Sequence, residues 1–494
     1  MTLVWLLVLP FVGAVLCWPA ERLHAQAPRW IALVTMACVL ALVCSLGLGD
    51  LLPSAASERW MLEVNAPWIS RFGIGFHLAL DGLSLLLVGL TGFIGLFAVA
   101  CSWREIRRGV GAFHTNLLWS LGGVVGVFLS VDLFLFFCFW EMMLVPFFFL
   151  IALWGHDMPG GRGRVYAATK YVIFTQASGL LMLLAILALA FVHAQATGVL
   201  SFDYVELLDT PLSQPVETWL MLGFFVAFAV KLSVVPLHSW LPEAHSQAPT
   251  AGSVMLAGLL LNTAGYGLLR FCIPLFPDAA AAFAPVAMWL GAIGVIYGAT
   301  LAFAQTDIKR LVAYSGVSHM GYVVIGVFAG TAQARAGVVM QMLSYGVCAA
   351  GLFIVCGAIF ERLHTRELGK LGGLWPGSRL PPIALFFAAA SLGLPGLGNF
   401  IGEFLILMGS FRVAPLPTVV AAGGLILSAV YALWFVQRAF FGVSRRPKPL
   451  PDLDLRERAT LYALMTLLLV LGLHPQPFVD VSGAATQVTG VSMQ

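Results

Sequence analysis

The chain has 494 residues, of which 60% are hydrophobic and only 10% are charged, and its formal net charge is +3. Soluble domains carry about 25% charged residues, so this composition excludes a soluble protein and indicates a chain that crosses a membrane many times. The small net charge gives no reason to expect a nucleic-acid partner.

Apolar runs long enough to cross a bilayer recur along the chain, and we expect about fourteen spans. The expected spans are 2–19, 29–49, 79–101, 113–130, 132–154, 166–192, 218–240, 249–273, 283–303, 307–329, 334–360, 381–411, 417–437 and 459–476. The N-terminus lacks the basic region of a secretory signal peptide, so we expect the first run to remain as a span. The sequence therefore predicts an all-α polytopic membrane protein.

Lys and Arg residues are distributed unevenly among the loops that join these spans. Of the 26 in the chain, twenty lie in or beside odd-numbered loops, five lie in or beside even-numbered loops, and Lys231 lies inside a span. Loops rich in Lys and Arg remain in the cytoplasm. We therefore expect both termini on the outer, periplasmic side of a bacterial inner membrane.

Two of the expected spans contain helix-breaking residues. Span seven runs into Pro236 and Pro242, and span twelve contains Gly393-Leu-Pro-Gly-Leu-Gly398. A broken helix needs protein or a water-filled cavity beside it, although a packed Pro or Gly kink is the simpler alternative. Because the breaks lie five spans apart, we expect two five-helix repeats, an arrangement in which transporters place ion sites. The predicted parts are 1–112 (helices 1–3), 113–273 (first repeat), 283–437 (second repeat) and 459–476 (last helix).

Lys231 is the one charged residue between Glu217 and Glu243. At about 1.5 Å per helical residue it lies about 21 Å from Glu217 and about 18 Å from Glu243. That is near the centre of a hydrocarbon core about 30 Å thick, where a charge costs at least about 2.5–3.5 kcal/mol. The side chain reaches only about 6 Å, which is too short for it to extend to the membrane surface. We therefore predict a functional lysine.

Two carboxyl groups lie inside other expected spans. Glu141 is in span five, and Glu403 follows the break in span twelve. A buried carboxyl and a buried amine that exchange a proton, as water and partner charges change, are the minimal parts of a proton relay. The alternatives are a structural ion pair between Glu141 and Lys231, and a Glu403 carboxylate near the membrane surface.

Three histidines are candidate relay residues because histidine can exchange protons near neutral pH. His238 and His245 follow Lys231, and His319 lies in span ten. A single histidine in a helix is also a common hydrogen-bonding core residue, and His238 and His245 could equally cap the loop after span seven. The sequence leaves both interpretations open.

Five motifs together resemble one protein family. They are Phe-Trp-Glu141-Met-Met-Leu-Val-Pro, Val-Lys231, His238-Ser-Trp-Leu-Pro-Glu-Ala-His245, Thr-Asp-Ile-Lys-Arg-Leu-Val-Ala-Tyr-Ser and Leu-Gly-Leu-Pro-Gly-Leu-Gly-Asn-Phe-Ile-Gly-Glu403. Over nearly its whole length the chain resembles the antiporter-like membrane subunits of respiratory complex I, the NADH–quinone oxidoreductase. The branch called subunit M in bacteria and chain 4 in mitochondria is the most similar, since the subunit L branch continues after its fourteenth span into a long lateral helix.

The resemblance implies a fourteen-helix bundle with two inverted five-helix repeats, in which Glu141, Lys231 and Glu403 carry protons. It also implies that NADH, FMN, iron–sulfur clusters and quinone bind to partner subunits, and that subunits of the L and N types are neighbours in the membrane arm. The chain itself has no nucleotide, haem or iron–sulfur motif, and its eight cysteines lack metal-ligand spacing. We therefore expect no catalytic, cofactor or metal site in it.

Three positions depart from the family pattern. Asn262 stands where the family usually has a lysine, Tyr345 where it usually has a histidine, and Ser233 where it usually has a proline. An asparagine can hydrogen-bond water but cannot carry a proton as a lysine does, and a tyrosine, with an ordinary pKa of about 10, is a poor relay at neutral pH. We hypothesise that proton transfer through the middle of this subunit is slowed or lost, with water held by Asn262 as the only substitute.

Two other functions remain open at this point. A subunit of an Mrp-type cation/proton antiporter or of a membrane-bound hydrogenase would use the same helices, so the fold alone does not discriminate between them. A non-pumping scaffold subunit of complex I is favoured by Asn262 and Tyr345. A stand-alone solute transporter is disfavoured because the spans contain no polar cluster suited to a larger substrate.

Overall fold

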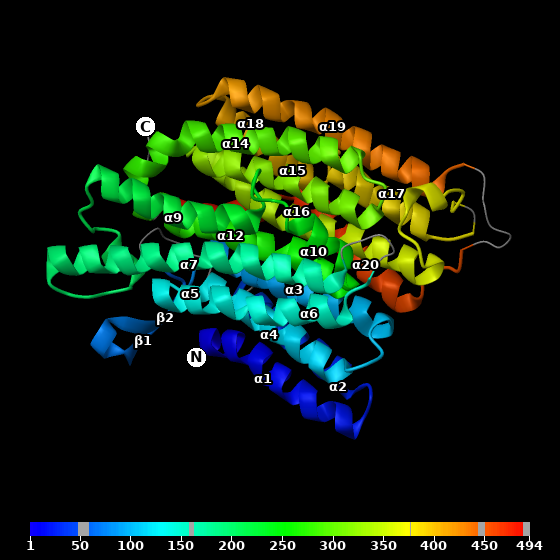
Figure 1. The fold of residues 1–494 in the computed structure, drawn as a ribbon, viewed down its shortest axis with the longest axis horizontal. Coiled ribbons are helices and arrows are strands. Elements are labelled where there is room, and N and C mark those ends of the chain that lie inside the picture. Colours follow the sequence, from blue (N-terminus) through cyan, green and yellow to red (C-terminus); the bar gives the residue numbers. More distant parts are fainter. Residues whose placement is uncertain (48–58, 158–162, 376, 443–449, 488–494) are drawn as a thin grey trace.

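The computed structural model describes residues 1–47, 59–157, 163–375, 377–442 and 450–487. Most of these residues are in helices that run roughly side by side, along the horizontal direction of Figure 1. A two-stranded sheet lies at one end of the bundle, at the left of the same figure. The all-α prediction is therefore correct for the bundle and wrong for this small sheet.

The first half of the chain forms the N-terminal helices and the sheet. Its elements are α1 (Thr2–Leu23), α2 (Ala27–Gly47), β1 (Leu62–Ile69), β2 (Ile74–Leu80), α3 (Gly82–Glu105), α4 (Val110–Leu129), α5 (Leu133–Met142), α6 (Leu144–Trp154), α7 (Arg164–Thr197), α8 (Tyr204–Leu207), α9 (Gln214–Leu232), α10 (Leu241–Gln247), α11 (Thr250–Met255), α12 (Leu261–Gly267) and α13 (Ile273–Leu275). Two π-helical turns, Leu256–Leu260 and Leu268–Cys272, join the last three into one continuous helix.

The second half of the chain completes the bundle. Its helices are α14 (Pro277–Phe303), α15 (Ile308–Phe328), α16 (Ala332–Leu363), α17 (Leu380–Ser391), α18 (Gly398–Phe411), α19 (Pro415–Phe440), α20 (Leu455–Leu473) and α21 (Gln476–Gln487). Sequence analysis predicted no helix at the position of α21, which follows α20 after a bend of 74°.

Twelve helices in the described ranges are long and apolar enough to cross a membrane, with α5–α6 and α11–α13 each counted as one. The bent pair α20–α21 also meets this criterion when its two helices are taken together. Two shorter apolar helices, α17 and α18, occupy the region where a broken span was expected. The polytopic helical membrane fold is confirmed, and the count of fourteen spans remains a prediction.

Both predicted interruptions are present, and backbone geometry explains each of them. In span seven, α9 ends at Leu232 because Ser233 takes a left-handed conformation with φ of 64°. The helix thus ends before it reaches Pro236, whereas the sequence attributed the break to the prolines. In span twelve, Gly393 and Gly396 have φ of 78° and 94° between α17 and α18, values that only glycine adopts at little cost.

The hairpin β1–β2 is attached to the end of the bundle through polar contacts. Its strands are antiparallel, with Leu62 opposite Leu80 and an irregularity next to Pro67. The buried His77 of β2 lies between the carboxylates of Asp203 and Glu63, and its Nε2 is 2.8 Å from the Glu63 carboxylate. A histidine enclosed in this way links the hairpin to the start of α8.

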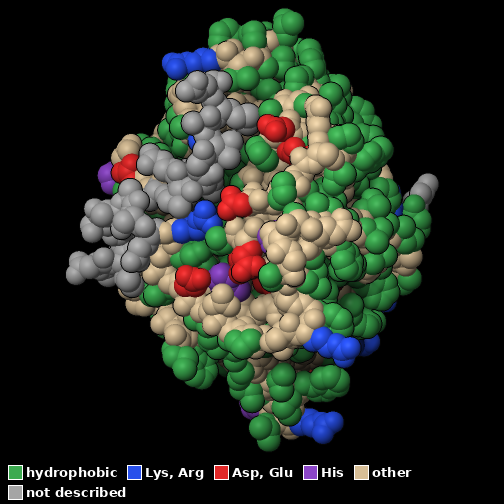
Figure 2. Space-filling view, turned by 90° about the vertical axis from the view of Figure 1, so that its left-hand side faces the viewer, with side chains coloured by type: hydrophobic (Ala, Val, Ile, Leu, Met, Phe, Trp, Pro, Cys, Tyr) green, Lys and Arg blue, Asp and Glu red, His purple; other side chains and the backbone are tan. Residues whose placement is uncertain are grey.

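Figure 2 views the bundle from the end that carries the hairpin. Acidic side chains gather near the middle of this face beside a histidine, while hydrophobic side chains cover much of its surroundings. Apolar flanks around a polar end are the pattern expected for a bundle surrounded by lipid.

The hairpin attachment should depend on pH. Burial lowers the pKa of His77, but hydrogen bonds to Asp203 and Glu63 and the charges of these carboxylates raise it above its ordinary value. A raised pKa means that the protonated histidine stabilises the folded hairpin, fully below about pH 6.5, and that this stabilisation is lost as the pH rises through the raised pKa. We expect limited proteolysis of the wild-type hairpin to become faster as the pH rises through this range, when each rate is divided by that of a His77→Phe variant at the same pH. An identical pH dependence in both proteins would contradict this expectation.

Candidate functional site

Lys231 lies at the C-terminal end of α9, one residue before the helix ends. The end is stabilised by Trp240, whose Nε1 donates to the Val230 carbonyl at 2.8 Å, so the break leaves this backbone oxygen bonded. The Lys231 side chain is only 3% exposed, and its Nζ lies 3.7 Å from the centroid of the Trp140 ring. Carbonyl groups at a helix C-terminus and the face of an indole ring both stabilise a cation. The sequence correctly predicted a deeply buried lysine, but it did not predict Trp140.

Glu141 is the next residue after Trp140 on α5, yet its carboxylate is directed towards α7. It lies against Gly179, where any side chain would overlap the carboxylate oxygen, and Gln176 on the same face of α7 is positioned to hydrogen-bond to it. Glu141 and Lys231 are close enough to interact electrostatically, but the ammonium contacts the indole ring and forms no direct ion pair with the carboxylate. The alternative of a fixed structural ion pair is therefore not what the structure contains.

Glu403 and His319 form the second polar cluster. The Glu403 carboxylate lies 2.8 Å from His319 Nδ1 and accepts a longer hydrogen bond of 3.4 Å from Gln341 Nε2. On the other side of the imidazole, Ser391 Oγ and the Tyr431 hydroxyl each lie 3.2 Å from Nε2. All of these side chains are buried in the protein, so the Glu403 carboxylate is enclosed by protein partners. The cluster joins α15, α16, α17, α18 and α19.

Asn262 lies in α12, between the two π-helical turns. Its Nδ2 donates to the carbonyl of Gly258 at 2.9 Å and to that of Met342, on α16, at 3.0 Å. Its Oδ1 is buried and has no hydrogen-bond partner. The side chain therefore connects two helices and presents one free acceptor to the interior.

Tyr345 belongs to the second cluster through its ring. It is buried, its ring centroid lies 5.4 Å from that of His319, and its hydroxyl lies against Gly316. The structure thus places this tyrosine beside a candidate relay histidine, although it forms no hydrogen bond with that imidazole.

His238 and His245 lie in a different part of the bundle. His238 follows α9, with its ring 5.4 Å from that of Tyr297, and His245, on α10, stacks on Phe353 at 4.4 Å. In each imidazole Nδ1 is buried without a hydrogen-bond partner. Neither histidine is part of the Glu403 cluster.

Sequence reasoning missed several polar residues that contact the predicted ones. A polar side chain inside an apolar span was the available signal for Gln176, Gln341 and Ser391, because such residues in a membrane need a partner. Trp140 and Tyr431 gave no such signal, since aromatic residues are common in apolar helices.

Three comparisons with known proteins agree on the relationship of this chain. The family model described as "NADH:quinone oxidoreductase/Mrp antiporter, TM" matches residues 130–428. NADH-quinone oxidoreductase subunit M of Pseudomonas aeruginosa is 60% identical over 491 residues, covering 98% of this chain and 96% of the relative. The protein of the same name from Escherichia coli K12 is 58% identical over 98% of this chain and 97% of its own length.

The fold gives the same result. A chain of respiratory complex I from Thermus thermophilus with bound NADH superposes with a TM-score of 0.87, at 31% sequence identity and 99% coverage of both chains. This likeness of the fold extends over nearly the whole chain. The chain therefore belongs to the NADH:quinone oxidoreductase/Mrp antiporter family, and it is an antiporter-like, proton-translocating membrane subunit of NADH–quinone oxidoreductase, complex I.

Proposed function

We propose that Glu141, Lys231 and Glu403 carry the protons that this subunit translocates. The observation that supports this most directly is that the buried Lys231 and the half-buried Glu141 interact electrostatically without a direct ion pair. Each has its own uncharged partner, Gln176 for the carboxylate and Trp140 for the ammonium. A locked ion pair would fix both charges, whereas separately held groups can exchange a proton, with the O–H bond of the acid breaking as the N–H bond of the amine forms.

His319 is the proposed relay beside Glu403. Its two ring nitrogens face different partners, the carboxylate through Nδ1 and the Ser391 and Tyr431 hydroxyls through Nε2. An imidazole can accept a proton at one nitrogen and release it from the other, which suits a residue between an acid and hydroxyl groups. We assign His238 and His245 to the route by which protons approach these groups, because each has a free, buried Nδ1.

We further propose that 113–273 and 283–437 are inverted repeats within a bundle of fourteen spans. The third helix of each proposed repeat is long, at 34 residues in α7 and 32 in α16. The fourth span of each is interrupted beside a charged residue, Lys231 in one and Glu403 in the other. The third helix also supplies a glutamine to a carboxylate in both, Gln176 to Glu141 and Gln341 to Glu403.

The unequal distribution of Lys and Arg supports a bacterial inner-membrane location with both termini on the periplasmic side. Subunits of the L and N types are the proposed neighbours in the membrane arm. NADH, FMN, iron–sulfur clusters and quinone are assigned to other subunits, whose electron transfer drives this one. The solved relative with bound NADH is consistent with that division of labour.

A scaffold role is the second candidate function, and Asn262 is the observation that favours it. Its hydrogen bond to the Met342 carbonyl joins α12 to α16, and an amide does not carry a proton as an amine does. The free Oδ1 nevertheless provides an acceptor for a water molecule, through which slow transfer could proceed. In our proposal the subunit pumps, and this middle step limits its rate.

Replacing the buried pair should reduce pumping without loss of the complex. We expect Lys231→Met and Glu141→Gln to slow proton translocation by this subunit on the order of 100-fold, the effect of removing one acid–base group. The measurement is the proton-to-electron ratio of the reconstituted complex oxidising NADH. Lys370→Met, an exposed lysine with 67% side-chain exposure, is the matched control. Normal ratios in assembled Lys231 and Glu141 variants would refute the proposed carriers.

Restoring the usual lysine should accelerate the middle step. We expect Asn262→Lys to raise the proton-to-electron ratio of the complex because an amine can carry the proton that the amide cannot. Asn262→Met, similar in size but without an ionisable group, is the control and should not raise it. If wild type already has a normal ratio and Asn262→Lys leaves it unchanged, the hypothesis of a slow middle step is wrong.

A further inference from the structure

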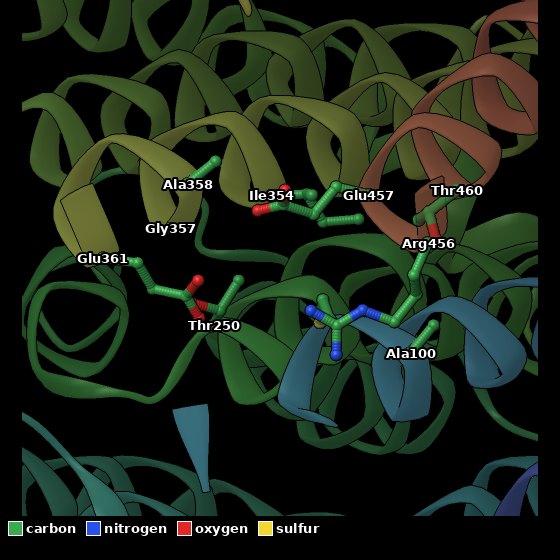
Figure 3. Close-up of a pocket in the computed structure, with 10 residues that line it drawn as sticks. Ala100, Thr250, Ile354, Gly357, Ala358, Glu361, Arg456, Glu457 and Thr460 are labelled. Carbon is green, nitrogen blue, oxygen red and sulfur yellow. The ribbon is translucent and has the colours of Figure 1, made fainter. Parts of the chain in front are cut away.

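A small cavity lies at the end of the bundle opposite the hairpin, where α3, α11, α16 and α20 meet (Figure 3). Thr250, Glu361, Arg456 and Glu457 supply its polar lining. Figure 3 shows the Glu361 carboxylate next to Thr250, with the Arg456 guanidinium extending towards them from α20. The cavity volume is about 20 Å³, and about 10–15 Å³ suffices for one water molecule. The cavity can therefore hold one water beside an ionisable carboxyl group.

Glu105 lies directly behind this cavity, as the last residue of α3. Both of its carboxylate oxygens accept from the backbone N–H of Thr250, at 3.0 and 3.1 Å. The side chain is only 9% exposed, and one oxygen lies 3.3 Å from His156 Nε2. Because Thr250 is both the cavity wall and the partner of Glu105, a single residue separates the buried carboxylate from the cavity.

The contact with His156 places the Glu105 carboxyl group beside a neutral imidazole. Burial lowers the pKa of His156 to about 3, and the cations Lys309, Arg366 and Arg164 contribute to the same shift. At neutral pH this histidine is therefore uncharged and does not neutralise Glu105. The cation that interacts with Glu105 is instead the Lys309 ammonium.

Lys309 is a buried lysine that the proposed proton route has not yet used. It is 1% exposed, and its Nζ donates to the backbone carbonyl of Ala248 at 2.8 Å. It interacts electrostatically with Glu105 on one side and with His245 on the other. A second buried amine between a carboxyl and a histidine repeats the chemistry of the Glu141–Lys231 site.

Two unpartnered polar atoms belong to α10, the helix that precedes the carbonyl to which Lys309 donates. His245 Nδ1 and Gln247 Oε1 have no hydrogen-bond partner, and both residues are at least nine-tenths buried, at 1% and 3% exposure. Buried polar atoms are almost always bonded to protein or to ordered water. Two such atoms on α10 thus indicate water-binding positions on the helix that precedes Ala248, the partner of Lys309.

Glu105 also caps the helix that begins at Thr250. Pro249, which precedes α11, provides no side-chain cap, so the Glu105 oxygens satisfy the first N–H of that helix. A glutamine oxygen would accept this hydrogen bond as well, but it would lack the negative charge that interacts with Lys309 and the ability to exchange a proton.

We propose that these residues form a proton entrance, in which Glu361 takes a proton from the solvent and the cavity water passes it through the Thr250 hydroxyl, which is positioned to hydrogen-bond to Glu105. Lys309 and His245 then conduct the proton from Glu105 into the bundle. At each step one O–H or N–H bond breaks as another forms, and Lys309 accepts only as a neutral amine. This entrance rests on the proposed function, because it supplies the groups assigned there. It also gives His245 a defined source of protons.

The test replaces carboxyl groups by amides in the complete complex. Glu105→Gln keeps an acceptor for the Thr250 N–H but cannot release a proton, so the entrance predicts a fall in the proton-to-electron ratio of at least about tenfold in this subunit's share. Glu361→Gln, at the outer wall of the cavity, should give the same direction of change. Glu367→Gln, a carboxylate with 51% side-chain exposure paired with Lys370, is the matched control and should behave as wild type.

The outcomes separate the entrance from the function on which it rests. If Lys231→Met lowers the ratio but Glu105→Gln and Glu361→Gln do not, the entrance is wrong and the proposed carriers stand. If none of the three lowers it, the proposed carriers are wrong as well. Should Glu105→Gln fail to assemble, Glu361→Gln alone decides, because a normal ratio in that variant overturns the entrance.

Discussion

A polar group inside a bilayer has no lipid partner for its hydrogen bonds, and this constraint determines where the functional groups of this protein can be. The end of α9 illustrates it. Ser233 turns the chain out of the helix, and Trp240 bonds to the Val230 carbonyl that the break exposes. Lys231 then lies at a helix C-terminus enclosed by protein, where the backbone stabilises its charge. An uninterrupted helix would have paired those carbonyl groups with its own N–H groups.

The same constraint produces two carboxylate sites of similar construction. Glu141 and Glu403 each have a glutamine from the long third helix of their proposed repeat, Gln176 and Gln341. Each carboxylate also approaches a glycine, whose missing side chain leaves the space it occupies. The sites differ in the basic partner, which is an amine in the first and a directly hydrogen-bonded imidazole in the second. Because the two sites share a carboxyl group but differ in the base beside it, they can bind protons with different affinities.

Features that depend on the local composition of the chain could be predicted from the sequence. Contacts between residues that are distant in the sequence could not. The apolar runs, both interruptions and the burial of Lys231 and Glu403 follow from hydropathy and from Gly and Pro positions. The partners of these groups depend on how each helix is rotated and on which rotamer each side chain adopts. Glu141 shows the consequence, since its rotamer directs it to α7 although the sequence suggested Lys231 as its partner. The hairpin was missed because its strands, of eight and seven residues, are much shorter than the apolar runs that identify membrane spans.

Asn262 brings the structural and transport roles into conflict at one position. Its amide nitrogen joins α12 to α16 through two backbone carbonyls. An amide does not exchange a proton near neutral pH, so these hydrogen bonds persist throughout the cycle, whereas a transporting lysine changes its charge and its number of N–H donors. The amide therefore favours a permanent connection between the two proposed repeats, and its free oxygen leaves proton movement to water. In our proposal only the middle step of proton transfer is slowed, because the acid and base groups on both sides of Asn262 are present.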